Sequence, residues 1–317
     1  QAINHSLTID NLSAWQNEDF FDTASSKIQK YDTIIIDEVQ DYKNEWLVII
    51  TKFFLKENGE FVVFGDEKQN IYNNMTADEN KKPRIPNVPG AWNRSLKESH
   101  RFQENLALLA MKFQKKFLGD KYEIDSIKSS KLNQSELFDN KQIEYYFFEQ
   151  PSDEIVHETV MQIARETEIH PSDICILDSR VESMRTLDYL IRTKSNERTQ
   201  TTFETQEVYG ELRKEHYPEN YLSLSGDEKK EIEKQIDKKI YDKIEDIRRN
   251  KKFHFYLKSG TMKLSTTHSF KGWESPALIL IIDQETDDAD PFTTDELIYT
   301  GFTRARFSLF IFNLGAN

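Results

Sequence analysis

Short apolar runs of strand length alternate with amphipathic helical segments along most of this 317-residue chain. The runs Thr33–Ile36 and Phe61–Phe64 are typical of buried strands, and between them apolar residues recur at helical spacing over Asn44–Lys56. Further strands are predicted at Ile143–Phe148, Ile174–Leu177, Met262–Ser265, Ala277–Ile282 and Ser308–Phe312, and further helices at Glu104–Phe117, Asp153–Glu166 and Arg180–Arg192. Alternation of this kind predicts an α/β fold built on parallel sheets with right-handed crossovers.

The length of the chain suggests about two domains. The Pro-rich segment Lys82–Gly90 is a candidate loop or boundary, and Asn58-Gly59 is a candidate turn. Residues 194–252 interrupt the alternation, because they are polar, rich in Lys and Glu, and helical in pattern around Asp227–Arg249. We therefore predict one domain over residues 1–98 and a second over residues 99–317, with a mostly helical insertion at about residues 194–252.

Charge and cysteine usage narrow the classes of protein that fit. The net charge of −13 counts against nucleic-acid binding, because phosphate contacts need Lys and Arg, although binding depends on a local groove rather than on the whole-chain sum. The single cysteine, Cys175, excludes an internal disulfide framework and a cysteine-clustered metal site, and its apolar neighbours predict a small buried side chain. No run approaches the roughly 20 apolar residues of a membrane span. No signal peptide is visible either. The single cysteine fits a reducing setting, so we expect a cytoplasmic protein.

Acidic residues follow the first predicted strand directly, in the segment Asp37–Asp41 (DEVQD). In nucleotide-hydrolysing α/β proteins, ligands collect at the carboxyl ends of the strands. An acid such as Asp37 can hold the water shell of Mg²⁺ there, and a second carboxylate, Glu38, can position and deprotonate the attacking water. Taken alone, a strand that runs into a solvated acidic loop explains this segment better.

A second polar segment, Gly65–Tyr72 (GDEKQNIY), follows the second predicted strand. Gln69 can hydrogen-bond a γ-phosphate and report its loss, and Tyr72 can stack on a base. Taken alone, a surface turn with a packed tyrosine is again the better explanation.

Together, the two segments resemble superfamily 1 helicases of the UvrD/Rep type, which have D-E-x-Q-D and, one strand later, G-D-x-x-Q-x-I-Y. The resemblance implies two RecA-like domains of the P-loop NTPase fold, the first of them truncated, with ATP bound between them. It implies a DNA helicase or translocase that couples hydrolysis of ATP, with Mg²⁺, to movement on single-stranded DNA. It assigns Mg²⁺ to Asp37, catalytic roles to Glu38 and Gln69, and a DNA contact to Tyr72.

Two arginines extend the resemblance. Ser95–Phe102 stands where the family has L-x-x-N-Y-R, so Arg101 matches the arginine that reaches the γ-phosphate, although the family's Asn-Tyr is replaced by Ser-His. Leu297–Arg306 is similar to Y-V-A-x-T-R-A, so Arg304 corresponds to the arginine finger and Tyr299 to a residue near the nucleotide.

The most specific single segment is Thr266–Glu274 (TTHSFKGWE), which resembles the family's T-x-H-x-x-K-G-L-E. The resemblance implies DNA contacts for Thr266 and His268, and a contact between Glu274 and the nucleotide sugar. We expect Gly272 to permit a tight turn from strand to helix. For His268 alone, a structural hydrogen bond is the default interpretation.

The family's phosphate-binding loop, G-x-x-x-x-G-K-[ST], has no counterpart among the 317 residues, and neither has the adenine-reading segment. We expect both to lie upstream, outside this sequence. The chain by itself should therefore not hydrolyse ATP at a useful rate.

The expected partner is single-stranded DNA, or a duplex with a single-stranded tail, bound by a monomer without a membrane. The insertion is short for the family, which favours a translocase or a DNA-dependent ATPase that serves a nuclease domain or subunit as a variant of this hypothesis. The alternative from another class is a non-catalytic RecA-like scaffold that binds nucleotide, DNA or protein. The acidic charge and the missing loop favour the scaffold, whereas the retained Glu38 and Arg304 oppose it.

Overall fold

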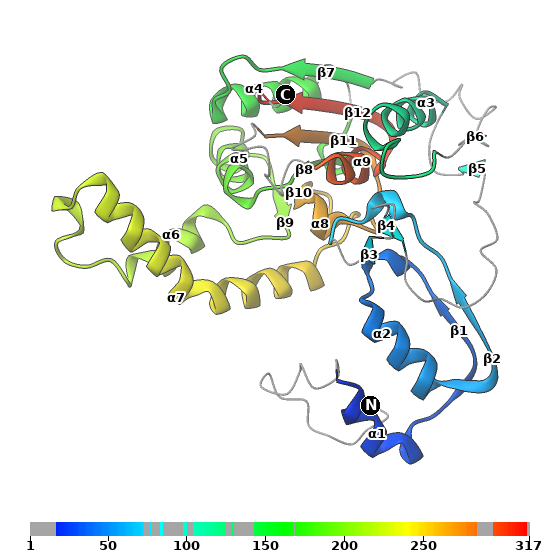
Figure 1. Ribbon diagram of the computed structural model, residues 1–317. Helices are drawn as coiled ribbons and strands as arrows, with labels where there is room; N and C mark the ends of the chain where they lie inside the picture. Colours follow the sequence, from blue (N-terminus) through cyan, green and yellow to red (C-terminus); the bar gives the residue numbers. More distant parts are fainter. Residues whose placement is uncertain are drawn as a thin grey trace. The chain divides into compact units, whose positions relative to one another are not determined.

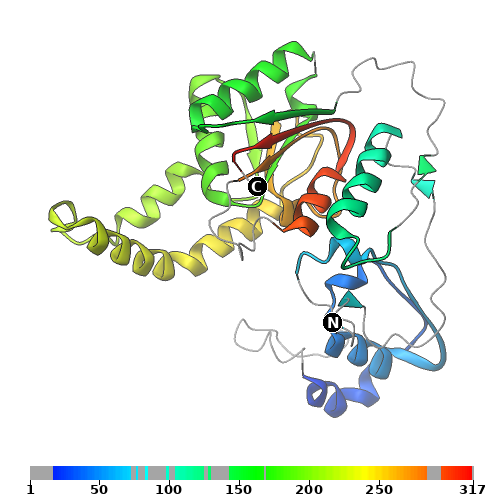
Figure 2. The same cartoon turned by 45° about the horizontal axis from the view of Figure 1, so that its top comes forward.

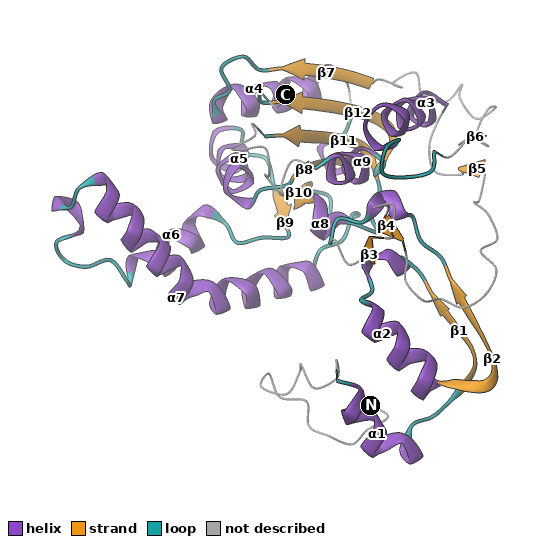
Figure 3. Cartoon of the chain, in the orientation of Figure 1, coloured by secondary structure: helices purple, strands orange, loops and turns teal. Residues whose placement is uncertain are grey.

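The computed structural model describes residues 17–72, 104–124, 143–167, 169–283 and 294–315, together with the two-residue strands β3 (Thr76–Ala77), β4 (Pro83–Arg84), β5 (Glu98–Ser99) and β6 (Lys128–Ser129) (Figure 1). The chain divides into two compact units. Unit 1 comprises residues 1–96 and 112–126, and unit 2 comprises residues 97–111 and 127–317. Helices and strands alternate in both units (Figure 3), as the periodicity predicted.

Unit 1 contains a β–α–β crossover. The strands β1 (Tyr31–Ile36) and β2 (Leu55–Val63) pair in parallel, and α2 (Asn44–Ile49), continued by a π-helix over Ile50–Phe54, connects them. A further helix, α1 (Glu18–Ala24), precedes β1. The parallel pairing matches the prediction, because a crossover through a helix joins parallel rather than antiparallel strands.

Burial along β1 differs from the prediction of a fully buried strand. Ile36 is buried with Val39 and Leu47, whereas Ile35 is 65% exposed. Successive side chains of a strand point to opposite faces, so only the face beneath α2 is covered within the described residues. The predicted turn at Asn58-Gly59 is also wrong as a chain reversal. These residues lie inside β2, at a register shift between the pairs Tyr31–Leu55 and Thr33–Glu60.

Unit 2 is built on a six-stranded parallel sheet with the order β7-β12-β11-β8-β10-β9. Its strands are β7 (Ile143–Phe147), β8 (Ile174–Asp178), β9 (Thr199–Thr201), β10 (Met262–Thr266), β11 (Ser275–Ile282) and β12 (Ala305–Asn313). Five of them were predicted. The sixth, β9, falls within the predicted insertion but pairs with β10 at the edge of the sheet.

Helices cover both faces of this sheet. The apolar side chains of α4 (Asp153–Glu166) and α5 (Val181–Lys194) pack with Ile279, Ile281 and their neighbours in the main core. Leu280 points to the opposite face, where α9 (Asp295–Phe302) approaches so closely that a Cβ on Gly301 would lie 2.7 Å from Leu280 Cδ1. The short helix α8 (Thr267–Phe270) follows β10 directly. Parallel strands buried between two layers of helices confirm the predicted α/β class and are consistent with a RecA-like domain.

The helices α6 (Gln206–Lys214) and α7 (Gly226–Phe253) form an arm that extends away from the sheet (Figure 1, Figure 2). α7 begins with a capping box between Ser225 and Glu228, in which each side chain satisfies a backbone N–H of the other residue. The arm has a small core of its own, in which Ile236, Ile240 and Ile244 of α7 pack with Tyr209, Leu212, Tyr217 and Ile232.

The predicted helix over Glu104–Phe117 is present as α3 (Glu104–Phe113), extended by a π-helix over Gln114–Leu118.

Cys175 is fully buried in β8, and this burial raises the pKa of its thiol, as expected of a structural cysteine. None of the helices in the described part of the chain is both long and apolar enough to cross a bilayer.

Candidate functional site

The carboxyl end of β1 changes direction at Glu38, which has a left-handed backbone conformation (φ 51°, ψ 44°). Non-glycine residues rarely adopt this conformation, and it concentrates at functional positions. The backbone N–H of Glu38 donates to Asp37 Oδ1 at 2.9 Å, and Gln40 Nε2 donates to Glu38 Oε2 at 2.5 Å. The two acids that were assigned to Mg²⁺ and to water activation thus lie at a turn whose geometry is fixed by their neighbours.

The segment after β2 is joined to this turn through Gln40, which is completely buried. Gln40 Oε1 accepts a hydrogen bond from the backbone N–H of Asp66 at 3.1 Å, while its amide group donates to Glu38. Asp66 in turn accepts from Gln69 Nε2 at 3.0 Å. Glu38, Gln40, Asp66 and Gln69 therefore form one hydrogen-bonded chain, named here the strand-end network, which joins the two motifs.

Gly65 is required by this arrangement. A Cβ at this position would lie 2.6 Å from Gln40 Oε1 and 2.8 Å from Val39 Cγ1, distances that Cβ atoms do not tolerate. Tyr72 follows the network and is 47% exposed, so its ring is accessible. Partial burial, and secondarily the charge of Asp41, raise the pKa of Tyr72.

In unit 2, Thr266 and His268 lie at the carboxyl edge of the six-stranded sheet. Thr266 ends β10, pairs with Asp178 of β8, and caps α8, since its hydroxyl accepts a hydrogen bond from the backbone N–H of Ser269 at 3.2 Å. His268 lies in the single turn of α8 and is partly exposed. The Thr266 hydroxyl thus has a structural role in the cap, and the DNA contacts assigned to the two residues stay predictions.

Glu274 and Arg304 lie at the opposite, amino-terminal edge of the same sheet. They precede β11 and β12, which begin with the pair Ser275 and Ala305, and the Ser275 N–H donates to the Arg304 carbonyl at 3.0 Å. Glu274 is half-exposed and lies 3.8 Å from Arg306 Nε. The structure therefore places the expected DNA residues and the expected nucleotide residues of unit 2 at different edges of the sheet.

Arg304 and Tyr299 are both buried, with 1% and 3% exposure. Arg304 Nε donates to the Thr300 carbonyl at 3.1 Å, and the Tyr299 ring packs edge-on against Phe302. Their predicted contacts with a nucleotide stay predictions. Arg101, the other arginine assigned to the γ-phosphate, lies outside the described residues.

The turn that was expected at Gly272 lies at a different place. Gly272 has φ 86°, but it follows α8 and leads into β11, whereas the passage from β10 into α8 is made directly at Thr266. The glycine therefore permits a turn from helix to strand.

Sequence reasoning missed a pair of acids at the carboxyl edge of unit 2. Asp178 is completely buried at the end of β8, where it accepts hydrogen bonds from Ser183 Oγ at 2.6 Å and from the backbone N–H of Arg180 at 3.1 Å. Burial, and secondarily the nearby Asp283, raise the pKa of Asp178 to about 7. Arg180 Nε lies 3.7 Å from Asp283. The available signal was the same as for Asp37, an acid directly after a buried strand.

The residues at the end of β1 fit a magnesium ion that also binds phosphates. Within the described ranges, no group of three or more His, Cys, Asp and Glu side chains is arranged to hold a metal ion. Mg²⁺ is usually held in such proteins by one or two carboxylates, with waters and substrate phosphates completing its octahedron. Asp37 supplies one such carboxylate, which suits an ion that arrives with a nucleotide.

Comparison with known proteins agrees with these motifs. Residues 5–81, about a quarter of the chain, match the UvrD/REP helicase N-terminal domain. The C-terminal domain of a possible DNA helicase from Lactobacillus plantarum WCFS1 is similar to 69% of this chain over 89% of its own, with 11% identity and a TM-score of 0.37, too low to bear on fold or function. Among curated proteins, none matches the chain.

The parallel sheets, with motifs at their strand ends, are those of an α/β protein and are consistent with RecA-like domains. Residues 5–81 match the UvrD/REP helicase N-terminal domain, in agreement with the predicted resemblance in the part that contains Asp37, Glu38 and Gln69. This segment is thus similar to DNA helicases of the UvrD/REP type.

Proposed function

We propose that this chain forms part of an ATP-dependent DNA helicase or translocase, which couples ATP hydrolysis to movement on single-stranded DNA. One observation supports this above the others. The strand-end network joins Glu38 to Gln69 inside the segment that matches the UvrD/REP domain. A solvated acidic loop would not need a fully buried glutamine between its acids and the neighbouring strand end.

The chemistry proposed for unit 1 is phosphoryl transfer to water. Mg²⁺, held by Asp37 and the phosphates, would supply charge neutralisation. Glu38 acts as the base that orients and deprotonates the water, and Gln40 fixes the Glu38 carboxylate through its 2.5 Å hydrogen bond. Gln69, whose amide donates to Asp66, would respond to the γ-phosphate.

In unit 2, we assign the carboxyl edge to DNA and the amino-terminal edge to the nucleotide. Thr266 and His268 lie at the first edge, and Glu274 and Arg304 at the second. The separation of the two groups supports distinct roles, because a strand of DNA and a nucleotide bound at one place would compete for the same atoms.

The sequence contains no G-x-x-x-x-G-K-[ST] loop, so the 317 residues alone should show no DNA-stimulated ATPase activity. A polypeptide that joins them to such a loop should hydrolyse ATP when single-stranded DNA is added. In that polypeptide, Glu38→Gln should lower kcat by about a hundredfold or more, because it removes the base but keeps the shape of the side chain. Glu57→Gln, an exposed change on β2, is the matched control.

The net charge of −13 and the missing loop favour a second candidate, a RecA-like scaffold that binds DNA or protein without turnover. The same measurement separates the two proposals. A loop-containing wild type as inactive as its Glu38→Gln variant would support the scaffold. Robust ATPase activity of the 317 residues alone would contradict our account of the phosphate site. A DNA-dependent ATPase that serves a nuclease would hydrolyse ATP but would not separate a duplex by itself.

A further inference from the structure

The strand β7 forms one edge of the six-stranded sheet of unit 2 (Figure 1). Within the described part of the chain it pairs with β12 alone, in a register that runs without a bulge from Ile143 to Phe147. The opposite edge strand, β9, is a polar run of only three residues. Proteins protect the edges of sheets with short strands, charges, proline or bulges. β9 has this protection, whereas β7 is longer, regular and rich in aromatic residues.

The hydrogen bonds to β12 show which backbone groups of β7 face outward. The Phe148 N–H donates to the Asn313 carbonyl of β12 at 2.9 Å. Successive residues of a strand direct their N–H and C=O groups to opposite sides in the plane of the sheet. The groups of Ile143, Tyr145 and Phe147 therefore point away from β12, toward the position of a further strand.

The side chains of the same three residues form an exposed apolar row. Tyr145 and Phe147 are each 60% exposed, and Ile143 is 37% exposed. Asn313 Nδ2 donates to the Tyr145 hydroxyl at 2.8 Å, so the Tyr145 ring is held in place although it is accessible. A strand that pairs with β7 would thus meet apolar side chains at every second position.

The other face of β7 and the neighbouring helix α4 are acidic. The Tyr146 hydroxyl donates to Glu144 at 2.5 Å. Burial, and after it the adjacent Glu144 and Glu166, raise the pKa of Tyr146 to about 12. Residues 143–164 contain no Lys or Arg and five acids, Glu144, Glu149, Asp153, Glu154 and Glu158. On this face, a pairing strand is favoured if its side chains are cationic.

The size and charge of this edge decide between two kinds of occupant. The exposed parts of Ile143, Tyr145 and Phe147 amount to about 300 Å². A stable complex buries about 800 Å² on each partner. A second copy of this chain would also bring a net charge of −13 and another acidic β7. Area and charge therefore both favour a short cationic segment of another protein over a stable dimer.

We propose that β7 binds an extended segment of a partner protein as a seventh strand, a segment in which apolar residues alternate with Lys or Arg. Its apolar side chains lie beside Ile143, Tyr145 and Phe147. Its cations lie on the other face, beside Glu144 and Glu166. In this mode of recognition, main-chain hydrogen bonds provide affinity and the alternating side chains provide specificity. The proposal is independent of the function proposed above.

The test measures binding of the 317-residue chain to a fluorescent peptide of about eight residues, in which lysine and valine alternate. One control peptide has the same composition with the lysines and valines in two blocks, and another replaces every lysine by glutamate. Fluorescence anisotropy should show binding of the alternating lysine–valine peptide. Both controls should bind at least about tenfold more weakly, because one lacks the alternation and the other has the wrong charge.

Two changes at Tyr145 separate the backbone contribution from that of the side chain. Tyr145→Pro removes an outward N–H and no hydrogen bond to β12, and it should weaken binding by about tenfold or more. Tyr145→Thr keeps this N–H and a strand-forming side chain but loses the ring, and it should weaken binding by about twofold to about fivefold. Tyr241→Ala is the matched control, because it removes a 59% exposed tyrosine of α7, and it should have no effect.

Unchanged peptide affinity in Tyr145→Pro, with native circular dichroism, would overturn strand addition at β7. Equal binding of the alternating and the block peptide would reduce the interaction to non-specific charge attraction and would overturn it too, as would a wild-type chain that binds neither. Analytical ultracentrifugation that shows a dimer, dissociated by Tyr145→Pro, would assign the edge to a second copy and overturn the choice of partner. All of these outcomes leave the proposed ATPase untouched.

Discussion

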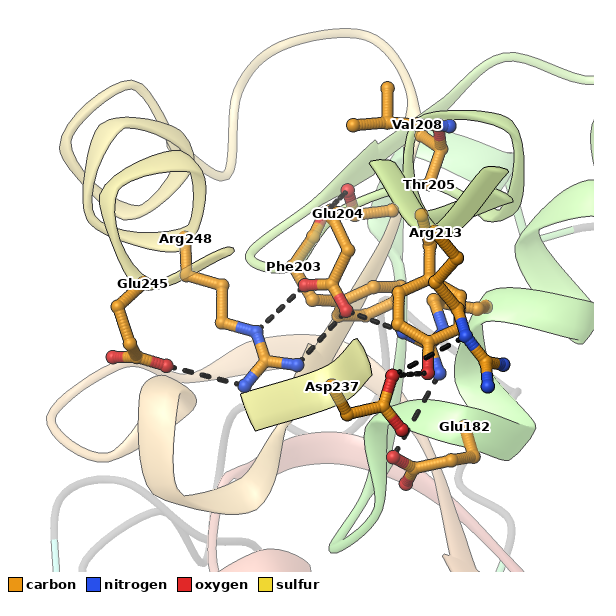
Figure 4. Close-up of polar contacts among 12 residues, drawn as sticks. Glu182, Phe203, Glu204, Thr205, Val208, Arg213, Asp237, Glu245 and Arg248 are labelled. Atoms are coloured by element: carbon orange, nitrogen blue, oxygen red, sulfur yellow. Dashed lines mark hydrogen bonds and ion pairs between the residues drawn. The ribbon is translucent and has the colours of Figure 1, made fainter. Parts of the chain in front are cut away.

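Replacing Glu204 by Gln should destabilise unit 2 strongly, because one buried carboxylate holds two guanidinium groups. Glu204 is completely buried and accepts from Arg185 Nη1 at 2.6 Å and from Arg248 at 2.7 and 2.9 Å (Figure 4). Burial alone would raise the pKa of Glu204, but the two arginines outweigh it and hold this pKa below its usual value. The side chain therefore stays ionised in the folded protein.

The size of this loss of stability follows from the charges that stay buried after Glu204 is replaced. Removing one partner from a buried ion pair costs about 3–5 kcal/mol, because the other charge stays buried without compensation. Glu204→Gln leaves the buried guanidinium of Arg185 with only the exposed Glu182 at 3.8 Å, and that of Arg248 with only Glu245 at 3.3 Å, although the amide oxygen still accepts one hydrogen bond. We expect a loss of about 3 kcal/mol in the free energy of unfolding. Arg248→Met should cost less, because Arg185 and Glu204 then remain a balanced pair.

Urea denaturation followed by circular dichroism and tryptophan fluorescence measures the loss. Glu245→Gln is the matched control, since Glu245 meets Arg248 at 3.3 Å but is 39% exposed, and it should cost less than about 1 kcal/mol. Amide exchange should also rise along α6 and α7, which Arg248 holds to the sheet. Equal losses for the Glu204 and Glu245 variants would refute the reasoning.

Two further predictions concern the sheet of unit 2. Because the pKa of Asp178 is raised to about 7 by burial and by Asp283, the folded state keeps a proton that the unfolded state releases near pH 4. The contribution of this carboxyl group to the free energy of unfolding is therefore most favourable below about pH 4, and it declines by at most about 4 kcal/mol up to about pH 7. Asp178→Asn should flatten this decline in urea titrations at different pH values. Parallel stability curves for the wild type and the variant would contradict the prediction. Gly301→Ala should destabilise the protein by about 1 kcal/mol, because the new Cβ would meet the buried Leu280. Gly210→Ala, whose Cβ would have no atom within 4 Å, should raise the stability by up to about 1 kcal/mol. Thermal unfolding that ranks the two variants the other way would be evidence against close packing of α9.

Most strands could be predicted because their signal is local. Ile174–Leu177 and Ala277–Ile282 are continuous apolar runs, as expected of parallel strands covered on both faces, and both are central strands of the sheet. β9 could not be predicted, because Thr199–Thr201 is short and polar and owes its place to pairing with β10, more than 60 residues further along the chain. The apolar neighbours of Ile35 predict a buried side chain. Its exposure depends instead on what covers its face of the sheet, which the local sequence does not show.

The candidate site likewise has a part that could be predicted from the sequence and a part that could not. That the segments at Glu38 and Gln69 lie together was predictable, because carboxyl ends of adjacent parallel strands meet at one edge. The role of Gln40 was not, since its two hydrogen bonds require the actual turn after β1. The internal contacts of Arg248 and Lys251 could not be predicted either, because Glu204 and Thr201 are brought to them from more than 40 residues away in the sequence.

The passage from β10 to β11 leaves almost no spare chain. β10 and β11 both pair with β8. Thr266 of β10 lies opposite Asp178, whereas Ala277 of β11 lies opposite Ile174, so Ser275 at the start of β11 lies about 20 Å back along the sheet from Thr266. The eight residues 267–274 cover this distance and the two strand spacings across it, about 22 Å in all, and four of them are coiled in α8. Their greatest reach is about 25 Å, so the slack is shorter than one extended residue. The length of this stretch therefore cannot change: deleting a single residue would have to unwind α8 or pull β11 out of step with β8.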